Sequence, residues 1–275
     1  INVGLVGSEM CIRDSGYIII EKQLTNNLSA RITPDISVDE EGDGRGDIEM
    51  RIKYLHLKYK IQDLGFITKP FFEIGLAHRP WLGFEEHINS YRVQGKMFME
   101  RAQIYNSADL GVTFFGLLGG TVDESYQKNV NKYMPGRWGS FAVGVYNGGG
   151  YHAIEENNNK TIESRVSLRP LPDILPGLQF HYTGAFGKGN TAREPEWGLN
   201  AGAVSFETAR FIVMGQYYDG LGNSFGSFVN AANESLDHDG YSLFAEYKLP
   251  SIKSDVFARY DHLNGEKFSG STSRI

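Results

Sequence analysis

The chain has 275 residues, of which 41% are hydrophobic and 13% aromatic, and its formal net charge is −6 at pH 7. An acidic chain is excluded as a nucleic-acid binder by bulk charge, because such proteins present a basic face. The sequence also holds no run of 18 apolar residues, and this excludes a membrane-spanning helix by length.

The start of the chain looks foreign to the rest. The stretch VGSEMCIRDS has neither helical nor strand periodicity, and it holds the single cysteine, Cys11. Back-translation of residues 5–14 with one codon choice resembles the transposase adapter used to prepare shotgun DNA libraries. We therefore expect residues 1–15 to be a non-native head; the alternative is a short irregular N-terminal arm. Residues 16–275 then form the native part, which has no cysteine for a disulfide or a thiolate-bound metal.

Alternation of apolar and polar residues predicts about twelve β-strands in residues 16–275. Most are close to the ~9–11 residues that a tilted strand needs to cross a membrane. Little of the chain has helical periodicity, and only a turn of helix is expected within 91–105. The expected strands span 17–24, 28–35, 47–61, 69–79, 109–118, 139–147, 161–169, 177–187, 197–206, 209–218, 240–249 and 253–262.

The strand at 47–61 changes phase part-way. Ile48 and Met50 occupy the apolar positions of its first half, and Leu55 and Leu57 those of its second half. The switch predicts either a β-bulge or two adjacent apolar residues near Tyr54.

Short and long connectors alternate along the chain. The short ones are TNN, QDLGFIT, PLPDILP, ET and PSI; the long ones span 36–46, 80–108, 148–160, 188–196 and 219–239. Transmembrane barrels sort their loops in this way, with short periplasmic turns and longer extracellular loops. One connector, 119–138, is long where a short turn is due, and the pattern gives no reason for it.

Aromatic residues near strand ends fit the girdles of such a barrel, where rings sit at the membrane interface. We therefore predict an all-β, antiparallel transmembrane β-barrel, incomplete at the C-terminus. The alternative is a secreted or surface β-sandwich, lectin-like, in which the same aromatics fill a core. The aromatics expected to face outward are Trp81, Trp138, Trp197, Tyr182, Tyr217 and Tyr260.

No catalytic or metal motif rises above background. The acidic stretches EEGDGRGDIE (40–49) and LDHDG (236–240) do not match the spacing of a calcium loop and are expected to be solvated loops. No Ser/His/Asp arrangement can be placed by spacing. We therefore expect no enzyme, no metal and no cofactor.

Basic residues gather in one part of this acidic chain. Between Arg51 and Ile104 there are nine Lys and Arg against five Asp and Glu. Rings of Arg and Lys make a pore select anions. The alternative is that these bases are ordinary solvated charges on the surface of a soluble β-protein. The candidate pore-lining, anion-binding residues are Arg51, Lys53, Lys58, Arg79, Arg92, Lys96, Arg101, Arg165, Arg169 and Arg259.

The segment 72–111 resembles the phosphate-selective porin O and P family. The shared features are the strand end IGLAHRP, the pair Glu100-Arg101 and the strand start SADLG, and YNGGGY (146–151) and VFARYD (256–261) are also similar. The resemblance is loose and spans most of 16–263.

The resemblance implies a sixteen-stranded, trimeric barrel in the outer membrane of a Gram-negative bacterium, with a basic lumen. It also implies that loop 80–108 folds inward and brings Arg92, Lys96 and Arg101 to a constriction. Few lysines lie in that loop, so a general small-anion or mixed-solute pore is the alternative to phosphate. The expected partners are small anionic solutes, outer-membrane lipid and two further copies of the chain. A fragment lacking its closing strands is expected not to conduct, because lipid does not tolerate open edges.

Overall fold

A computed structural model of the chain contains one antiparallel sheet of 14 strands, in which each strand pairs with its neighbours in sequence. The structure describes residues 2–7, 16–38, 46–91, 95–151, 153–249, 251, 254–268 and 270–274. The strands are β1 (Asn2–Gly7), β2 (Gly16–Gln23), β3 (Leu28–Val38), β4 (Ile48–Lys60), β5 (Ile67–His78), β6 (Ala108–Leu118), β7 (Gly139–Tyr146), β8 (Thr161–Leu168), β9 (Leu178–Lys188), β10 (Glu196–Glu207), β11 (Phe211–Leu221), β12 (Asp237–Leu249), β13 (Ser254–Gly265) and β14 (Gly270–Arg274). The helices are α1 (Leu82–Glu85), α2 (Phe98–Arg101) and α3 (Glu124–Asn129), and a 3₁₀ turn spans Glu266–Phe268.

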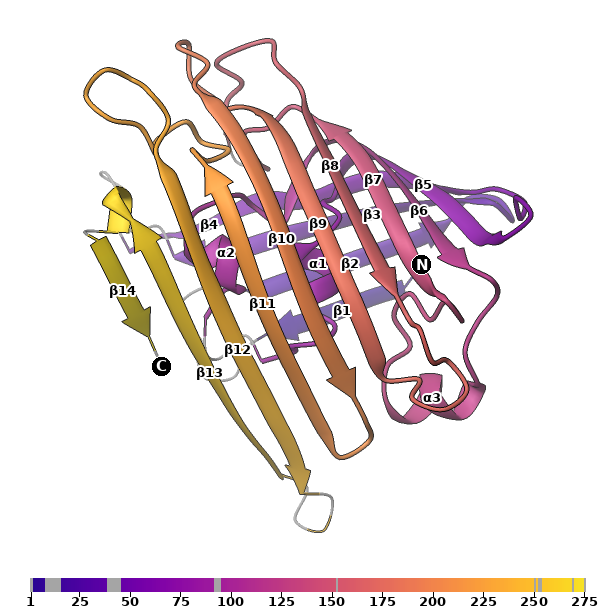
Figure 1. The fold of residues 1–275 in the computed structure, drawn as a ribbon. Helices are drawn as coiled ribbons and strands as arrows, with labels where there is room; N and C mark the ends of the chain where they lie inside the picture. The colour runs from indigo at the N-terminus through magenta and orange to yellow at the C-terminus, as the bar shows by residue number, and fades with distance from the viewer. Residues whose placement is uncertain are drawn as a thin grey trace.

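The strands predicted from alternation correspond to β2 to β13, and their ends differ by no more than about three residues. The long connectors 36–46, 80–108, 148–160, 188–196 and 219–239 leave one end of the sheet, and the short turns leave the other end together with the connector 119–138 (Figure 1). The end with the long connectors is therefore the extracellular end, as in other transmembrane barrels.

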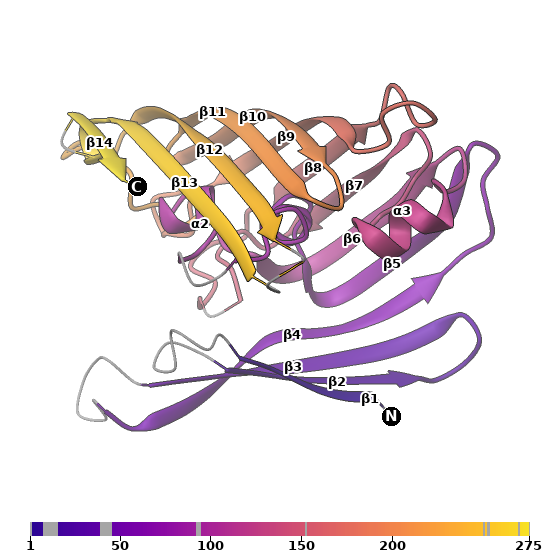
Figure 2. The same ribbon diagram turned by 90° about the horizontal axis from the view of Figure 1, so that it is seen from below.

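The sheet curls around a central space that holds α1 and α2 (Figure 2). Strands β1 to β4 lie along one side, and β9 to β14 lie along the opposite side. The two groups separate because β4 and β5 pair only from Leu55–Leu76 to Lys60–Phe71, close to the turn end of the strands. The order of the described strands begins at β1 and ends at β14, without a pairing that joins these two.

The outer face of the sheet is apolar. Val166 is 38% exposed and Phe180 is 47% exposed, whereas the neighbouring Ser167 and Thr183 are buried inside. A soluble sandwich buries its apolar face, so this arrangement corresponds to strands facing lipid. No described helix has the length and apolarity to cross a membrane. The outward apolar side chains include Leu55, Leu57, Ile74, Val112, Val143, Ile162, Val204, Val213, Leu243 and Val256.

The predicted bulge lies at the phase switch of β4. Thr33 pairs with Tyr54 and Pro34 pairs with Ile52, so Lys53 is the additional residue. Lys53 and Tyr54 are therefore both buried, and the apolar face resumes at Leu55. Pro34 suits this position, because proline cannot donate a ladder hydrogen bond and is tolerated at bulges.

Two of the aromatics expected in the interfacial girdles are inside instead. Trp81 and Trp197 are 1% and 2% exposed, whereas Trp138, Tyr182 and Tyr217 are exposed as expected. The expectation for Trp81 and Trp197 was wrong because these residues belong to an apolar cluster within the barrel. Tyr260 is half-buried and packs against the ring of Tyr241.

Part of the N-terminal head pairs with the sheet. Asn2 to Gly7 form β1, which runs antiparallel to β2 from Glu21 to Gly16. Residues 2–7 of the expected non-native head therefore form a strand although they have no strand periodicity, and residues 8–15 lie outside the described part. An edge strand offers unpaired N–H and C=O groups to any extended segment, so the pairing needs no side-chain pattern.

Candidate functional site

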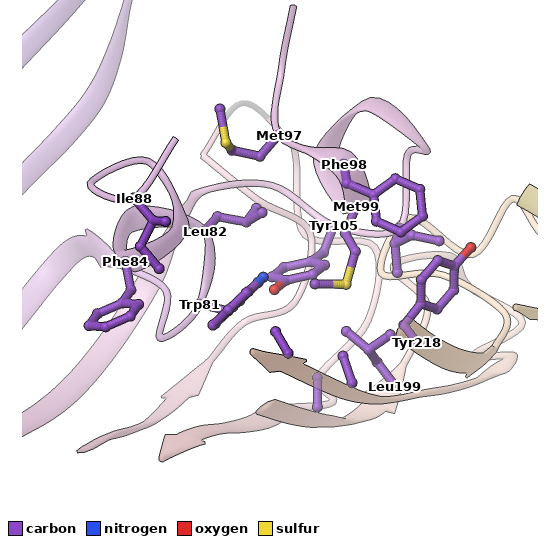
Figure 3. Packing of buried hydrophobic residues seen from close by; sticks show 14 of the residues in the cluster. Trp81, Leu82, Phe84, Ile88, Met97, Phe98, Met99, Tyr105, Leu199 and Tyr218 are labelled. Carbon is purple, nitrogen blue, oxygen red and sulfur yellow. The ribbon is translucent and has the colours of Figure 1, made fainter. Parts of the chain in front are cut away.

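The long connector between β5 and β6, residues 79–107, enters the barrel and packs against its inner wall. Both α1 and α2 belong to it, and their apolar side chains converge in one cluster (Figure 3). On the wall, Leu199 and Tyr218 meet this cluster (Figure 3). The inner faces of β10 and β11 are therefore largely apolar where a lumen wall would be polar. The buried connector residues are Trp81, Leu82, Phe84, Ile88, Met97, Phe98, Met99, Ala102, Ile104 and Tyr105.

Polar contacts fix the described part of the connector at three points. Arg165 Nε donates to the Pro80 carbonyl oxygen at 3.0 Å, near the start. In the middle, the Tyr91 hydroxyl donates to Asp255 Oδ2 at 2.7 Å. Near the end, Arg259 Nη1 donates to the Lys96 carbonyl oxygen at 3.0 Å. The connector thus crosses the interior from β5 to β13, and the expected inward fold of loop 80–108 is confirmed.

A buried ion pair holds the point where the connector leaves β5. The guanidinium of Arg79 contacts the carboxylate of Glu163 on β8, with Nε at 2.7 Å from Oε1. The Arg79 and Glu163 side chains are 0% and 3% exposed, and the guanidinium also lies over the ring of Tyr105. Because removal of one partner would leave a buried charge uncompensated, this pair holds the start of the connector against β8.

The connector 119–138, unexplained by the sequence pattern, folds into the barrel from the turn end. It carries α3, which is capped by Asp123 Oδ1 accepting from the Ser125 N–H at 2.7 Å. Asn131 Nδ2 donates to the His87 carbonyl oxygen at 3.0 Å, and the Tyr133 ring stacks on the His87 ring at 3.6 Å. Its length is therefore accounted for: it meets the β5–β6 connector, and the two together fill much of the interior.

A cavity of about 360 Å³ remains between these connectors and the inner face of β2 to β5. His87 and Tyr133 line it from the connector side, and its rim reaches the exposed residues Lys22 and Lys60. The lining holds four Lys and Arg but two carboxylates, so its fixed charge is positive. The complete lining is Glu21, Lys22, Gln23, Ser29, Ala30, Arg31, His56, Lys58, Lys60, Phe71, Glu73, His78, His87 and Tyr133.

Of the ten predicted pore-lining residues, Lys58 lies on this cavity. Arg51 is half-exposed and pairs with Asp35 at 3.8 Å and with Glu49 at 3.6 Å. Lys53 is buried, with Nζ 3.3 Å from the Tyr17 hydroxyl. Arg92 lies outside the described residues.

The remaining predicted residues make contacts that involve the connectors or the strands around them, and they do not line the cavity. Arg165 donates to Ser140 and Ser167 and lies over the Phe84 ring. Arg169 donates to the Gly136 carbonyl oxygen, and Arg101 lies 3.5 Å from Asp261. The other members, Arg79, Lys96 and Arg259, make the contacts given above.

Three cavity bases were not predicted: Lys22, Arg31 and Lys60. Arg31 and Lys60 occupy the polar phase of β3 and β4, so alternation placed them on the inner face without marking them. They differ from the other inner bases because the connectors do not cover them and pack against other parts of the inner wall. That distribution depends on tertiary contacts between distant segments, which no spacing along the chain reveals.

No family model matches the chain, and no curated protein matches its sequence. Solved structures are similar to it. An OmpT with loop L8 deleted, an outer membrane protein of Vibrio cholerae, has a TM-score of 0.54 and 12% identity over 94% of this chain and 75% of that chain. Outer-membrane expressed OmpT of Vibrio cholerae has a TM-score of 0.52 and 10% identity over 94% and 68%. The chain has the outer-membrane β-barrel fold.

This fold and the apolar outer face of the strands together place the protein in the outer membrane of a Gram-negative bacterium, as the sequence predicted. At these identities the likeness concerns the fold and leaves the phosphate-selective family as a proposal.

The exclusion of enzyme activity is corrected by the same comparison. The matched fold is that of OmpT, and a barrel fold does not decide between a passage and a catalytic site. Catalytic residues on separate strands meet only in the folded barrel, so the lack of a local triad motif in the sequence was not a valid ground for exclusion.

Proposed function

We propose that the protein is a porin through which small anionic solutes, phosphate among them, diffuse passively across the outer membrane. The observation that carries the proposal is the positive lining of the cavity left between the inward connectors and β2 to β5. Membership of the phosphate-selective porins and assembly as a homotrimer belong to the same proposal, and they rest on the resemblance of segment 72–111.

The connectors narrow the interior, so the few charged side chains on the cavity have a strong effect on which ions enter it. A narrow passage with low-dielectric walls focuses the field of the groups that line it and concentrates counter-ions. Here the wall opposite the bases consists of the rings of His87 and Tyr133. Arg31 is partly offset by Glu21 at 3.6 Å. The ammonium of Lys58 lies 3.7 Å from the Phe71 ring centroid, and both residues line the cavity.

The test is the reversal potential of the reconstituted full-length protein, with its barrel closed, under a KCl gradient across a planar bilayer. Replacement of Arg31, Lys58 and Lys60 by Gln removes charge with modest loss of length. Anion preference is expected to fall, most clearly at low salt, because salt shortens the reach of exposed charge. The matched control is Arg193→Gln, which removes one exposed base from an outer loop.

Cation preference in the unmutated protein would reject an anion passage. The control removes one charge and the test variant removes three, so a control shift of about one third of the shift in the test variant would mean that overall charge, rather than the cavity lining, sets the preference.

A further inference from the structure

Three potential metal ligands meet on the wall of the cavity. His56 lies on β4, and Glu73 and His78 lie on β5. His78 Nδ1 is 2.7 Å from Glu73 Oε2, His56 Nε2 is 3.7 Å from Glu73 Oε1, and the three ligand atoms all lie within 4.8 Å of one another. Among the residues that the structure describes, this is the one group of three His, Cys, Asp or Glu side chains close enough together to hold a metal ion.

The strand pairing brings the three together. His56 is opposite Gly75, midway between Glu73 and His78 in β5. A β-carbon on Gly75, whose φ is +124°, would lie 2.4 Å from the Leu55 carbonyl oxygen and 3.1 Å from His56 Cα. Glycine therefore permits the close approach of β5 to the backbone that carries His56, and no side chain at this position competes with the imidazole.

The separations suit a tetrahedral ion. At the tetrahedral angle, bonds of about 2.0–2.2 Å from imidazole nitrogen and carboxylate oxygen place neighbouring ligand atoms roughly 3.3–3.6 Å apart. The two separations to Glu73, 2.7 and 3.7 Å, lie on either side of that range. Small rotations of the side chains are therefore enough to reach it.

Outer contacts already orient both rings. His56 Nδ1 lies 3.4 Å from the Leu76 carbonyl oxygen, which leaves Nε2 directed at Glu73. A backbone carbonyl on the far nitrogen is a common arrangement for metal-bound histidine. The ring of His78 stacks on Tyr54, with centroids 4.1 Å apart and an interplanar angle of 26°.

The cluster faces the cavity, so an ion could enter and keep an open position. His56, Glu73 and His78 all belong to the cavity lining. Three protein ligands with a fourth position for water or a small anion are typical of zinc sites that bind a further molecule. The four bases of the lining, Lys22, Arg31, Lys58 and Lys60, oppose a cation, whereas Glu73 and Glu21 favour it. Two imidazoles select zinc, nickel, cobalt or copper over calcium and magnesium, which take oxygen ligands.

We propose that His56, Glu73 and His78 bind a divalent transition-metal ion of the zinc class, with one coordination position directed into the cavity. This site was not expected from the sequence, where the acidic loops were considered and no metal was predicted. The three ligands are spread over two strands and follow no metal-binding spacing. A bound ion would add positive charge to the lining, beside the bases that carry the proposed anion preference.

The test is binding of Co²⁺ to the folded protein in detergent, followed by its visible absorption and by displacement with Zn²⁺. His56→Gln, His78→Gln and Glu73→Gln are each expected to weaken Co²⁺ binding by at least about tenfold, since even outer contacts of metal ligands are worth about 10–100-fold. The matched control is His262→Gln on β13, which removes a histidine away from the cluster and should leave the affinity unchanged.

Heat-modifiable migration on gels shows that each variant is folded before its affinity is compared. X-ray absorption of the Zn²⁺-loaded unmutated protein gives a second readout that needs no variant, and two imidazole ligands are expected there. The proposal is overturned if the unmutated protein binds no Co²⁺, or if the three variants bind it as the control does. Either result would identify the cluster as a hydrogen-bonded carboxylate–imidazole group and nothing more.

Discussion

Gln216 Nε2 donates a hydrogen bond of 2.7 Å to Glu85 Oε1, joining β11 to the helix α1 inside the barrel. Glu85 is 1% exposed, and its Oε2 atom has no hydrogen-bond partner among the described residues. Burial raises the pKa of Glu85 to about 7, while the hydrogen bond from Gln216 and the charge of Arg259 act in the opposite direction. The connector is therefore docked through a carboxyl group that titrates near neutral pH.

The first prediction is that docking of the connector weakens as the pH rises toward neutrality. The pKa of Glu85 is about 7 when folded and 4.5 in its ordinary state, so between these values the folded state keeps a proton that the unfolded chain has lost. Stability is then fully present below about pH 4.5 and decreases up to about pH 7, by about 3 kcal/mol for a shift of this size. Urea unfolding at a series of pH values, followed by tryptophan fluorescence, measures it.

Glu85→Gln should remove the share of this pH dependence that Glu85 contributes, about 3 kcal/mol between pH 4.5 and 7, because the amide can still accept from Gln216 and carries no titrating proton. Glu234→Gln, which changes an exposed loop carboxylate, is the matched control and should keep it. If Glu85→Gln retains the full slope between pH 4.5 and 7, another group is responsible.

The second prediction concerns the buried pair of Arg79 and Glu163. Arg79→Met should lower the free energy of unfolding by about 3–5 kcal/mol, because Glu163 would be left buried without its partner. Adding Glu163→Gln to Arg79→Met should recover part of the loss, since the uncompensated charge is then gone. Urea unfolding of the single and double variants gives the comparison. A double variant less stable than Arg79→Met would contradict this reasoning.

The strands could be predicted from the sequence because lipid and lumen impose opposite polarity on alternate residues. The phase switch near Tyr54 was also readable, and it is a bulge at Lys53. Trp197 shows where this reasoning fails. Its apolar alternation with Leu199 and Ala201 suggested a lipid-facing side, yet these residues face a connector that enters from β5. Alternation identifies the apolar and the polar face of a strand. It does not tell which of them faces lipid when the barrel interior is filled by an apolar connector.

The site was harder to predict for a related reason. Arg165 and Lys58 have the same character in the sequence, each a base on the polar phase of a strand. In the structure the connector covers Arg165, which is 1% exposed, and leaves Lys58 on the cavity. Which inner bases stay accessible depends on how 79–107 and 119–138 fold inward, and those segments have no periodicity to follow.

The third prediction tests which side of the strands faces lipid. Val166→Arg should impair membrane insertion by about 2–4 kcal/mol if the site lies at the bilayer midplane. The inward control cannot be Ser167, because it is fully buried and its hydroxyl accepts from Arg165. Ser29→Arg is the better control, since Ser29 lies on the cavity and should tolerate the change. Folded yield in liposomes measures both, and equal losses would argue against the lipid-facing assignment.

The fourth prediction is that the connector 119–138 restricts the passage at the turn end. Tyr133 stacks on His87 at 3.6 Å, and Asn131 Nδ2 donates to the His87 carbonyl oxygen and to Glu207 Oε2. Tyr133→Ala with Asn131→Ala removes one ring stack and the two docking hydrogen bonds from Asn131 Nδ2, worth about 2 kcal/mol of docking together. That corresponds to a roughly 30-fold shift toward the undocked connector.

Single-channel recordings of the double variant should therefore show longer or larger open states than the unmutated protein. Tyr182→Ala, which truncates an exposed ring on the outer face of β9, is the matched control, because it changes aromatic area without touching the connectors. If the double variant and the unmutated protein have the same conductance and open times, the connector does not limit the passage. Since 119–138 reaches the cavity through Tyr133, a rise in conductance should be accompanied by weaker anion preference, because a wider passage lets more salt screen Lys58 and Lys60.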